Sequence, residues 1–386
     1  MSNLFNLKYM IILSFYFIIF LIVVFLTIHQ LTGPNYVSDL SAHASSVKPF
    51  FDGSIYIPHP LWHIFVHYMT YITLDVKFSA AIVTALFVMI WICIVQKIYI
   101  FFIGKEKKNI SIYSFLFIIF IIGPAYIPFF TNYIIAGTGS PNIWNNATLF
   151  TVKPFAILTV FFTILSLEKK HISYYLIGAI SLFISIFAKP SFVIAFLPAL
   201  ILLMIFKKIY SKENLIYIAI LSLISIGLLG YQFLNTFGEG KTKIIISFLG
   251  VWSNATPNVF VSILLAILFP LLYLIFNSDS VKKNNYLLLT WIMTFISIVY
   301  AAFLAEEGPR FYHGNFFWSY MVSLSLLYVF TLIDYYRNIT YINSRAKLLL
   351  NIILSWQILV GLYYFIAIIM TGGDPAGIVD LSIFFK

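Results

Sequence analysis

The chain has 386 residues, of which 62% are hydrophobic, 19% aromatic and only 9% charged, and its formal net charge is +10. A soluble domain carries about 25% charged residues, so this composition excludes a water-soluble globular protein, and the abundance of Phe, Ile and Leu excludes a disordered or nucleic-acid-binding chain. The single cysteine, Cys93, excludes a disulfide framework and a cysteine-based metal cluster.

Eleven apolar runs are candidates to cross a bilayer, whose hydrocarbon layer of about 30 Å requires a helix of about 20 residues. Backbone groups must be paired internally in lipid, and no alternating pattern of barrel strands is present, so we predict helices. The sequence therefore predicts an all-α, polytopic integral membrane protein with about 11 transmembrane helices in a single domain, 1–386, and a retained first helix rather than a cleaved signal peptide. The runs are 10–28, 78–95, 110–130, 149–167, 172–188, 192–206, 215–231, 259–276, 286–305, 316–333 and 348–370.

The basic residues predict the orientation. With the N-terminus inside, 15 of the 23 Lys and Arg residues fall in inner segments, as do only 5 of the 13 acids. This bias fits the positive-inside rule and predicts an N-terminus inside and a C-terminus outside the membrane. The basic inner loops are expected to contact lipid head groups. Six of the seven histidines lie in outer segments or at their boundary, so we expect any chemistry on the outer face.

The first outer loop, 29–77, is the longest segment between spans. Its part from Pro60 to Leu74 is apolar enough for a short interfacial helix, with proline at a favoured first position. His59, His63 and His67 recur at four-residue spacing along it and could hold a metal, anchor the segment, or accompany sugar stacking on Trp62. Residues 242–252 are predicted to form a second interfacial or re-entrant piece.

Asp39 and His43 follow the first span by about ten residues. A carboxylate held at a membrane surface can act as a general base toward a hydroxyl, with the histidine orienting it or sharing the proton. A helix-capping aspartate in a solvated loop is the alternative.

Lys189 lies at the tip of a hairpin between two short runs of 17 and 15 residues. At 1.5 Å per residue both runs are shorter than the hydrocarbon layer, so the lysine is expected in a recessed cavity, where its partner would be a phosphate. A lysine that snorkels from a helix end is the alternative.

A second outer loop, 305–315, concentrates ionisable residues, namely Glu306, Glu307, Arg310 and His313 beside Tyr312. Arginine suits bidentate phosphate binding, and histidine can donate a proton near neutral pH. A third outer segment around residues 140–148 places Trp144 and Asn145, which are sugar-binding side-chain types, before Lys153, a further candidate phosphate ligand.

Together these residues place a candidate base, Asp39, on the same side as three candidate phosphate ligands, Lys153, Lys189 and Arg310. In this arrangement the chain resembles the GT-C superfamily of polytopic glycosyltransferases, which take sugars from polyprenyl-phosphate carriers. The shared features are the many-helix topology, an acid soon after the first span, interfacial helices in the first outer loop, and basic residues near later outer boundaries.

The resemblance implies that Asp39 activates the acceptor hydroxyl, within a fold of shared amino-terminal helices and a variable remainder. Arg310 and Lys189, with Lys153, would bind the donor phosphate, and His313 would assist its departure. The predicted substrate-binding residues are His43, His59, Trp62, His63, Trp144, Asn145, Glu306, Glu307 and Tyr312. The chain departs from the paired-acid Asp-x-Asp pattern at Asp39, so no cofactor is predicted, and a divalent metal stays an alternative without a ligand pattern to support it.

The predicted function is transfer of a sugar from a polyprenyl-phosphate donor to a glycan or lipid-linked acceptor, in the synthesis of envelope polysaccharide or glycolipid. Three alternatives stay open. The first is a polymerase of lipid-linked oligosaccharides, of the O-antigen or capsule type, and the second is a flippase or transporter of lipid-linked sugars. The third is a membrane O-acyltransferase with His43 or His313 as base.

Overall fold

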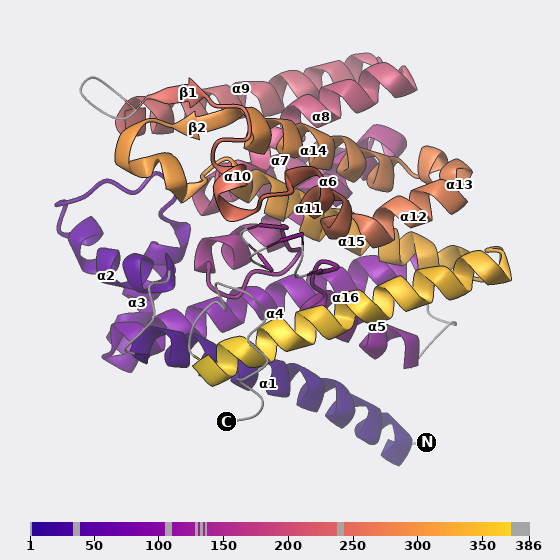
Figure 1. The fold of residues 1–386 in the computed structure, drawn as a ribbon, viewed down its shortest axis with the longest axis horizontal. Coiled ribbons are helices and arrows are strands. Elements are labelled where there is room, and N and C mark those ends of the chain that lie inside the picture. The colour runs from indigo at the N-terminus through magenta and orange to yellow at the C-terminus, as the bar shows by residue number, and fades with distance from the viewer. Residues whose placement is uncertain are drawn as a thin grey trace.

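The computed structural model describes residues 2–33, 39–104, 110–127, 130–131, 134–135, 137–237 and 243–371. These ranges are mostly helical, and seven of their helices are long and apolar enough to cross a membrane, or eight when one bent pair counts as a single span. The prediction of a helical, polytopic membrane protein is confirmed at this level (Figure 1). The long helices are α1 (Ser2–Thr32), α4 (Val76–Ile103), α6 (Ala147–Lys169), α9 (Lys212–Phe237), α14 (Asn285–Phe303), α15 (Phe317–Asn338) and α16 (Ser344–Thr371).

Three of the predicted spans form shorter apolar helices, α5 (Ile110–Ile121), α7 (Ile172–Ala188) and α8 (Ser191–Lys207). Helix α5 ends well before the predicted boundary at residue 130. Pro124 has no N–H with which to continue the helix, and Gly123 lies against the backbone of Gly361, where a Cβ would come within 3.0 Å. The amide of Asn142 donates to the carbonyls of Ile119 and Ile122, which satisfies the open end of the helix.

The predicted span 259–276 is broken into α11 (Val259–Ala266) and α12 (Leu268–Phe276), which meet at 66°. Pro270 causes the break, because it cannot donate to the carbonyl of Ala266 four residues earlier. The hydroxyl of Tyr328 donates to this carbonyl instead, at 2.6 Å. The backbone carbonyl of Ala266 is therefore hydrogen-bonded despite the bend.

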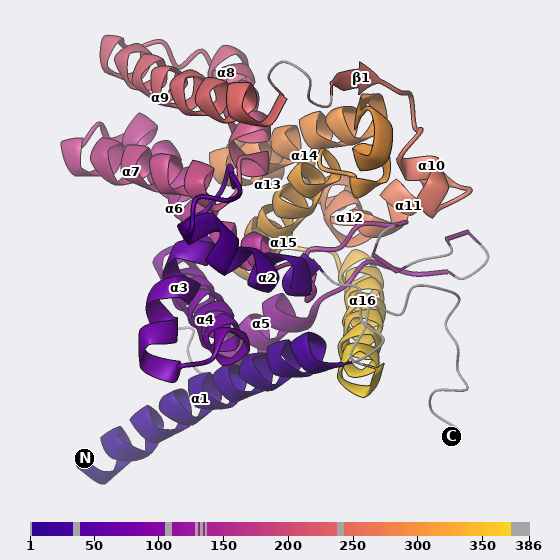
Figure 2. The same cartoon turned by 90° about the vertical axis from the view of Figure 1, so that its left-hand side faces the viewer.

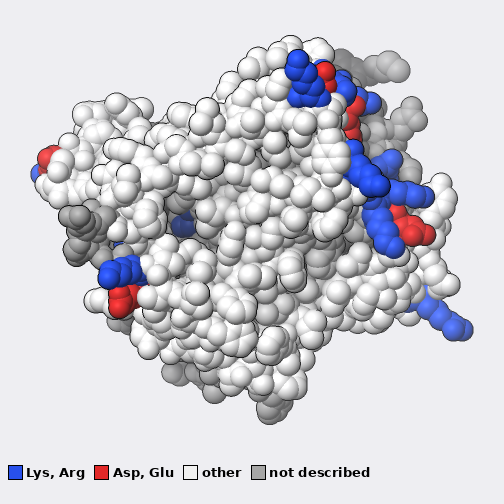
Figure 3. Space-filling view, turned by 90° about the horizontal axis from the view of Figure 1, so that it is seen from above, with Lys and Arg blue, Asp and Glu red and all other residues white. Residues whose placement is uncertain are grey.

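The two ends of the molecule differ in charge. Figure 3 shows Lys and Arg gathered at one end, with a broad band almost free of charge beside it. At this basic end Lys207, which closes α8, donates to the carbonyl of Lys282 in α13 (Ser278–Lys283), and Lys170 pairs with Glu213 at 3.4 Å. In Figure 1 the N-terminus and α13 lie at this end, and α2, α3 and the small sheet lie toward the other.

At the opposite end the first loop folds into α2 (Asp39–Phe51) and α3 (Leu61–Thr73), so the helix predicted from Pro60 to Leu74 is present. Of the segment 242–252, predicted as an interfacial or re-entrant piece, residue 242 lies outside the described residues, and residues 243–252 form a short strand, turns and the start of a helix. Strand β1 (Ile244–Ile246) pairs antiparallel with β2 (Leu304–Glu306), with Ile245 opposite Ala305. The short helix α10 (Trp252–Ala255) follows β1 along the chain (Figure 2), and η1 (Gly308–His313) follows β2.

Candidate functional site

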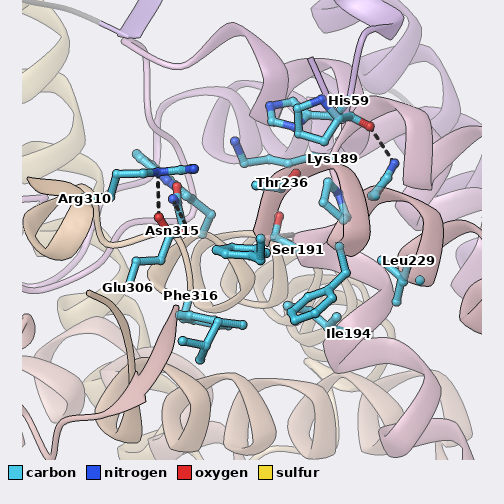
Figure 4. A pocket seen from close by; sticks show the side chains of 18 of the residues that line it. His59, Lys189, Ser191, Ile194, Leu229, Thr236, Glu306, Arg310, Asn315 and Phe316 are labelled. Carbon is cyan, nitrogen blue, oxygen red and sulfur yellow. Dashed lines mark hydrogen bonds and ion pairs between the residues drawn. The ribbon is translucent and has the colours of Figure 1, made fainter. Parts of the chain in front are cut away.

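A cavity of about 500 Å³ opens at this opposite end, between α8, α9 and the segment that follows β2. Its walls divide into a polar end and an apolar side. Figure 4 shows Arg310, Lys189 and His59 at the polar end, and Ile194 and Leu229 on the apolar side. The structure thus brings together three of the residues that the sequence predicted separately.

The apolar side is built by the facing surfaces of α8 and α9. Most large side chains of α9 are exposed, so this groove faces the surroundings of the protein rather than its core. Gly230 lines the groove, and a Cβ added there would meet no atom within 4 Å. The groove therefore has room for an apolar chain along α9. The apolar lining residues of the two helices are Ile194, Ile226, Leu229, Phe233 and Phe237.

Lys189 is the residue between α7 and α8, and its side chain is only 6% exposed. Its ammonium donates to the hydroxyl of Thr148 at 2.7 Å and lies 5.1 Å from the ring centroid of Trp318. The short helices on either side hold this residue in the cavity, as the sequence predicted. Within the described residues it has no carboxylate within ion-pairing distance, so its charge is available to an anionic ligand.

The first turn of α8 supports the same end of the cavity. Ser191 is 5% exposed and lines the cavity, and its hydroxyl has no hydrogen-bond partner in the described chain. Backbone N–H groups at the start of a helix favour negative charge. A buried unpaired hydroxyl beside a helix start and a lysine is the arrangement expected around a phosphate.

Arg310 is held in place by an acid. Its guanidinium Nε lies 2.7 Å from the carboxylate of Glu306, which is 4% exposed. The amide of Asn315 donates to the other oxygen of this carboxylate at 2.8 Å. Glu306 ends strand β2, so the small sheet fixes the acid and the acid orients the arginine at the cavity (Figure 4).

Asp39 connects to the cavity through a chain of hydrogen bonds. The side-chain amide nitrogen of Asn146 donates to the carboxylate of Asp39 at 2.6 Å, and the hydroxyl of Thr148 donates to the side-chain amide oxygen of Asn146 at 2.8 Å. Thr148 in turn accepts from Lys189. The negative charge of Asp39 also favours the charged form of Lys189, although the two groups do not form an ion pair. The carboxylate is exposed and begins α2, so it combines access from outside with a fixed position.

Three histidines pack beside this chain of hydrogen bonds. His43 Nδ1 lies 3.1 Å from His63 Nε2, and the ring centroids of His43 and His59 are 6.1 Å apart. Burial, and then the Lys189 ammonium, lower the pKa of His43 to about 3. Burial, and then His43, lower the pKa of His63 to about 3, and the pKa of His59 falls well below its usual value, first through burial and then through Lys189. All three rings are therefore neutral near pH 7.

The described part of the chain contains no group of three or more His, Cys, Asp or Glu side chains arranged to hold a metal ion. The three histidines lie in a region that already holds Lys189 and Arg310, whose charges would repel a cation. His67 lies apart from them, because its ring stacks on Phe51 at a centroid distance of 3.6 Å.

Other predicted site residues lie elsewhere. Lys153 is 3% exposed and donates to the carbonyl of Pro141 and to the amide oxygen of Asn142, so its ammonium supports a loop. Trp62 is fully buried and donates to Thr84, and Trp144 is 3% exposed. Neither indole is available to stack on a sugar.

The remaining predicted residues are also outside the cavity walls. Glu307, Tyr312 and His313 are exposed at the surface around η1, and Asn145 is partly buried in the turn before α6. His313 thus has no described contact with Lys189 or Arg310 through which to assist a leaving group.

Sequence reasoning missed the residues that connect Asp39 to Lys189 and α9 to the segment of His59. Asn146 and Thr148 lie within the outer segment around residues 140–148, but no local pattern links them to Asp39, which lies more than a hundred residues earlier. Gln232 was missed as well. Its amide donates to the carbonyl of Pro58 at 2.6 Å and so holds α9 against the segment that carries His59.

Comparisons of this chain with protein-family models, with curated proteins and with solved structures find no match.

Proposed function

We propose that this protein is a membrane glycosyltransferase of GT-C type, which transfers a sugar from a polyprenyl-phosphate donor to a glycan or lipid-linked acceptor. In this proposal the eleven apolar helices all cross the bacterial cytoplasmic membrane, the N-terminus is inside, and the cavity opens on the outer face. The lysine-rich end opposite the cavity supports this orientation.

One observation carries the proposal. A single cavity joins an apolar groove between α8 and α9 to a cationic end formed by Lys189 and Arg310. A lipid phosphate has the same two parts, an apolar chain and an anionic head. The hydrogen-bonded chain from Lys189 to Asp39 then places a carboxylate next to the head-group end.

The chemistry follows from these positions. Asp39 accepts the proton of an acceptor hydroxyl, and the oxygen attacks the anomeric carbon of the donor sugar. The bond between that carbon and the phosphate oxygen breaks, and the phosphate leaves with the bonding electrons. Lys189, Arg310 and the start of α8 stabilise the additional negative charge on the leaving polyprenyl phosphate.

Transfer by the purified protein tests the proposal, with a prenyl-phosphate sugar as donor and product detection by mass spectrometry. Asp39→Asn is expected to lower turnover by at least about a hundredfold while donor binding is retained, since general base catalysis contributes about 10²–10⁴-fold. Lys189→Met is expected to weaken donor binding by about tenfold or more. Product length separates single transfer from polymerisation.

Two exposed residues outside the cavity give matched controls, Asp52→Asn in the same loop and Lys77→Met near the start of α4. Both are expected to retain wild-type turnover. Unchanged turnover in Asp39→Asn and Lys189→Met, with folded protein, would contradict the assignment.

A further inference from the structure

A second cavity, of about 370 Å³, lies at the basic end, far from the site described above. It is enclosed by the ends of α4 and α6, by α13, by the start of α14 and by the end of α15. The proposed glycosyl transfer does not use it.

Two acids in its wall are already satisfied. Asp334 is 2% exposed and accepts from the hydroxyl of Tyr273 at 2.7 Å, from Ser280 at 2.7 Å and from the amide of Asn284 at 3.0 Å. Glu168 accepts from the amide of Asn285 at 2.9 Å. These carboxylates hold the short helix α13 and the start of α14 in place.

Two cations in the same wall lack such partners. Arg337 and Lys283 line the cavity and are exposed, and neither forms an ion pair within the described residues. Unpaired cations beside satisfied acids leave the cavity open to an anion.

Two further polar groups are buried and unpartnered. Tyr286 lines the cavity and is 5% exposed, its ring is packed against Phe102 at 5.0 Å, and its hydroxyl has no hydrogen-bond partner in the described chain. The amide oxygen of Asn285, also in the wall, is buried without a donor. A buried polar group without a partner is costly, so both groups indicate a ligand that supplies an acceptor and a donor.

We infer that this cavity binds a phosphate-bearing ligand that also carries hydroxyl groups, with Arg337 and Lys283 on the phosphate, and Tyr286 and Asn285 on the polar remainder. Phosphatidylglycerol from the membrane and a free polyol phosphate share this chemistry. Basic pockets between helices at a membrane surface are known to hold anionic head groups.

The test uses native mass spectrometry of the full-length protein in detergent, with phosphatidylglycerol, with phosphatidylcholine of the same acyl chains, and with glycerol phosphate. We expect one tightly bound phosphatidylglycerol or glycerol phosphate, and weaker binding of phosphatidylcholine. Binding that glycerol phosphate displaces points to a soluble ligand, and binding that it leaves in place points to the lipid.

The variant Arg337→Gln/Lys283→Gln is expected to weaken this binding by about tenfold or more. Arg345→Gln/Lys347→Gln, at the start of α16, removes the same two residue types outside the cavity and is expected to leave it unchanged. Tyr286→Phe removes one buried oxygen atom only, so it tests the site even where the double variant is poorly folded, and we expect about a threefold loss. Two outcomes would overturn the inference. The first is that Tyr286→Phe binds as the wild type does and that the two double variants bind equally well. The second is that the protein binds phosphatidylglycerol and phosphatidylcholine equally well.

Discussion

Asn146 donates a 2.6 Å hydrogen bond from its amide nitrogen to the carboxylate of Asp39, and its amide oxygen accepts from the backbone N–H of Leu149 at 3.0 Å. One side chain therefore both orients the proposed base and caps the start of α6. These two roles can be separated by substitution.

Asn146→Asp keeps an oxygen for the helix cap but loses the donor to Asp39 and places a second carboxylate beside it. We expect the thermal stability to fall only slightly and sugar transfer to fall by at least about tenfold, since a charge-assisted hydrogen bond is replaced by repulsion. Turnover by the purified variant, with its unfolding midpoint, is the measurement.

Asn146→Ala provides the comparison. It removes cap and donor together, so we expect a loss of about 1 kcal/mol in the free energy of unfolding in addition to the loss of transfer. Full transfer in Asn146→Asp would show that the bond to Asp39 is not needed for activity.

Gly230 gives a way to block the apolar groove without disturbing the protein core. A Cβ there meets nothing within 4 Å, and the residue lines the cavity. Gly230→Leu is therefore expected to fold normally and to weaken binding of a long prenyl-phosphate donor by about tenfold or more, because the new side chain occupies the space of the lipid chain. Donor binding by the purified variant measures the effect.

Gly227 is the matched control, since it lies on the same helix and also faces open space but does not line the cavity. Gly227→Leu is expected to bind the donor as the wild type does. Equal binding in both variants would place the lipid elsewhere.

The apolar runs predicted the helices well, because burial in lipid constrains composition along the whole run. The breaks within them were harder to predict. The end of α5 depends on the close contact of Gly123 with Gly361. At the bend near Ile267, the hydroxyl of Tyr328 donates to the backbone carbonyl that Pro270 leaves without a helical donor. Both are contacts between residues far apart in the sequence, which no local pattern reveals.

The candidate site shows the same division. The recessed position of Lys189 could be predicted because the two apolar runs around it are too short to cross the hydrocarbon layer. The placement of Arg310 could be predicted only as part of a loop rich in ionisable residues. Its anchoring depends on Glu306, which the pairing of β1 with β2 fixes. Three consecutive isoleucines at 244–246 are compatible with a strand, but no local pattern identifies the partner strand at Leu304–Glu306.

Lys153 is expected to matter for stability rather than for donor binding. Its buried ammonium donates to Pro141 at 2.9 Å and to Asn142 at 3.0 Å, and Asn142 in turn caps α5. Lys153→Met leaves these acceptors unpaired, so we expect the free energy of unfolding to fall by about 1–3 kcal/mol. Donor affinity at a temperature where the variant is folded should equal that of the wild type. A loss of donor affinity without a loss of stability would instead support the prediction that Lys153 binds the donor phosphate.

The neutral histidines predict how stability depends on pH. The pKa of His43 and that of His63 are lowered from 6.5 to about 3 in the folded protein, so the unfolded chain binds more protons than the folded protein between these values. Stability therefore falls as the pH decreases from 6.5 toward 3, and these two groups contribute no pH dependence above this window.

Unfolding midpoints should decline as the pH is lowered across this range for the wild type, and should decline less steeply for His43→Gln/His63→Gln. His171→Gln, which removes a histidine at an exposed position, is the control and should follow the wild type. Parallel curves for all three proteins would mean that His43 and His63 are not held neutral by the fold.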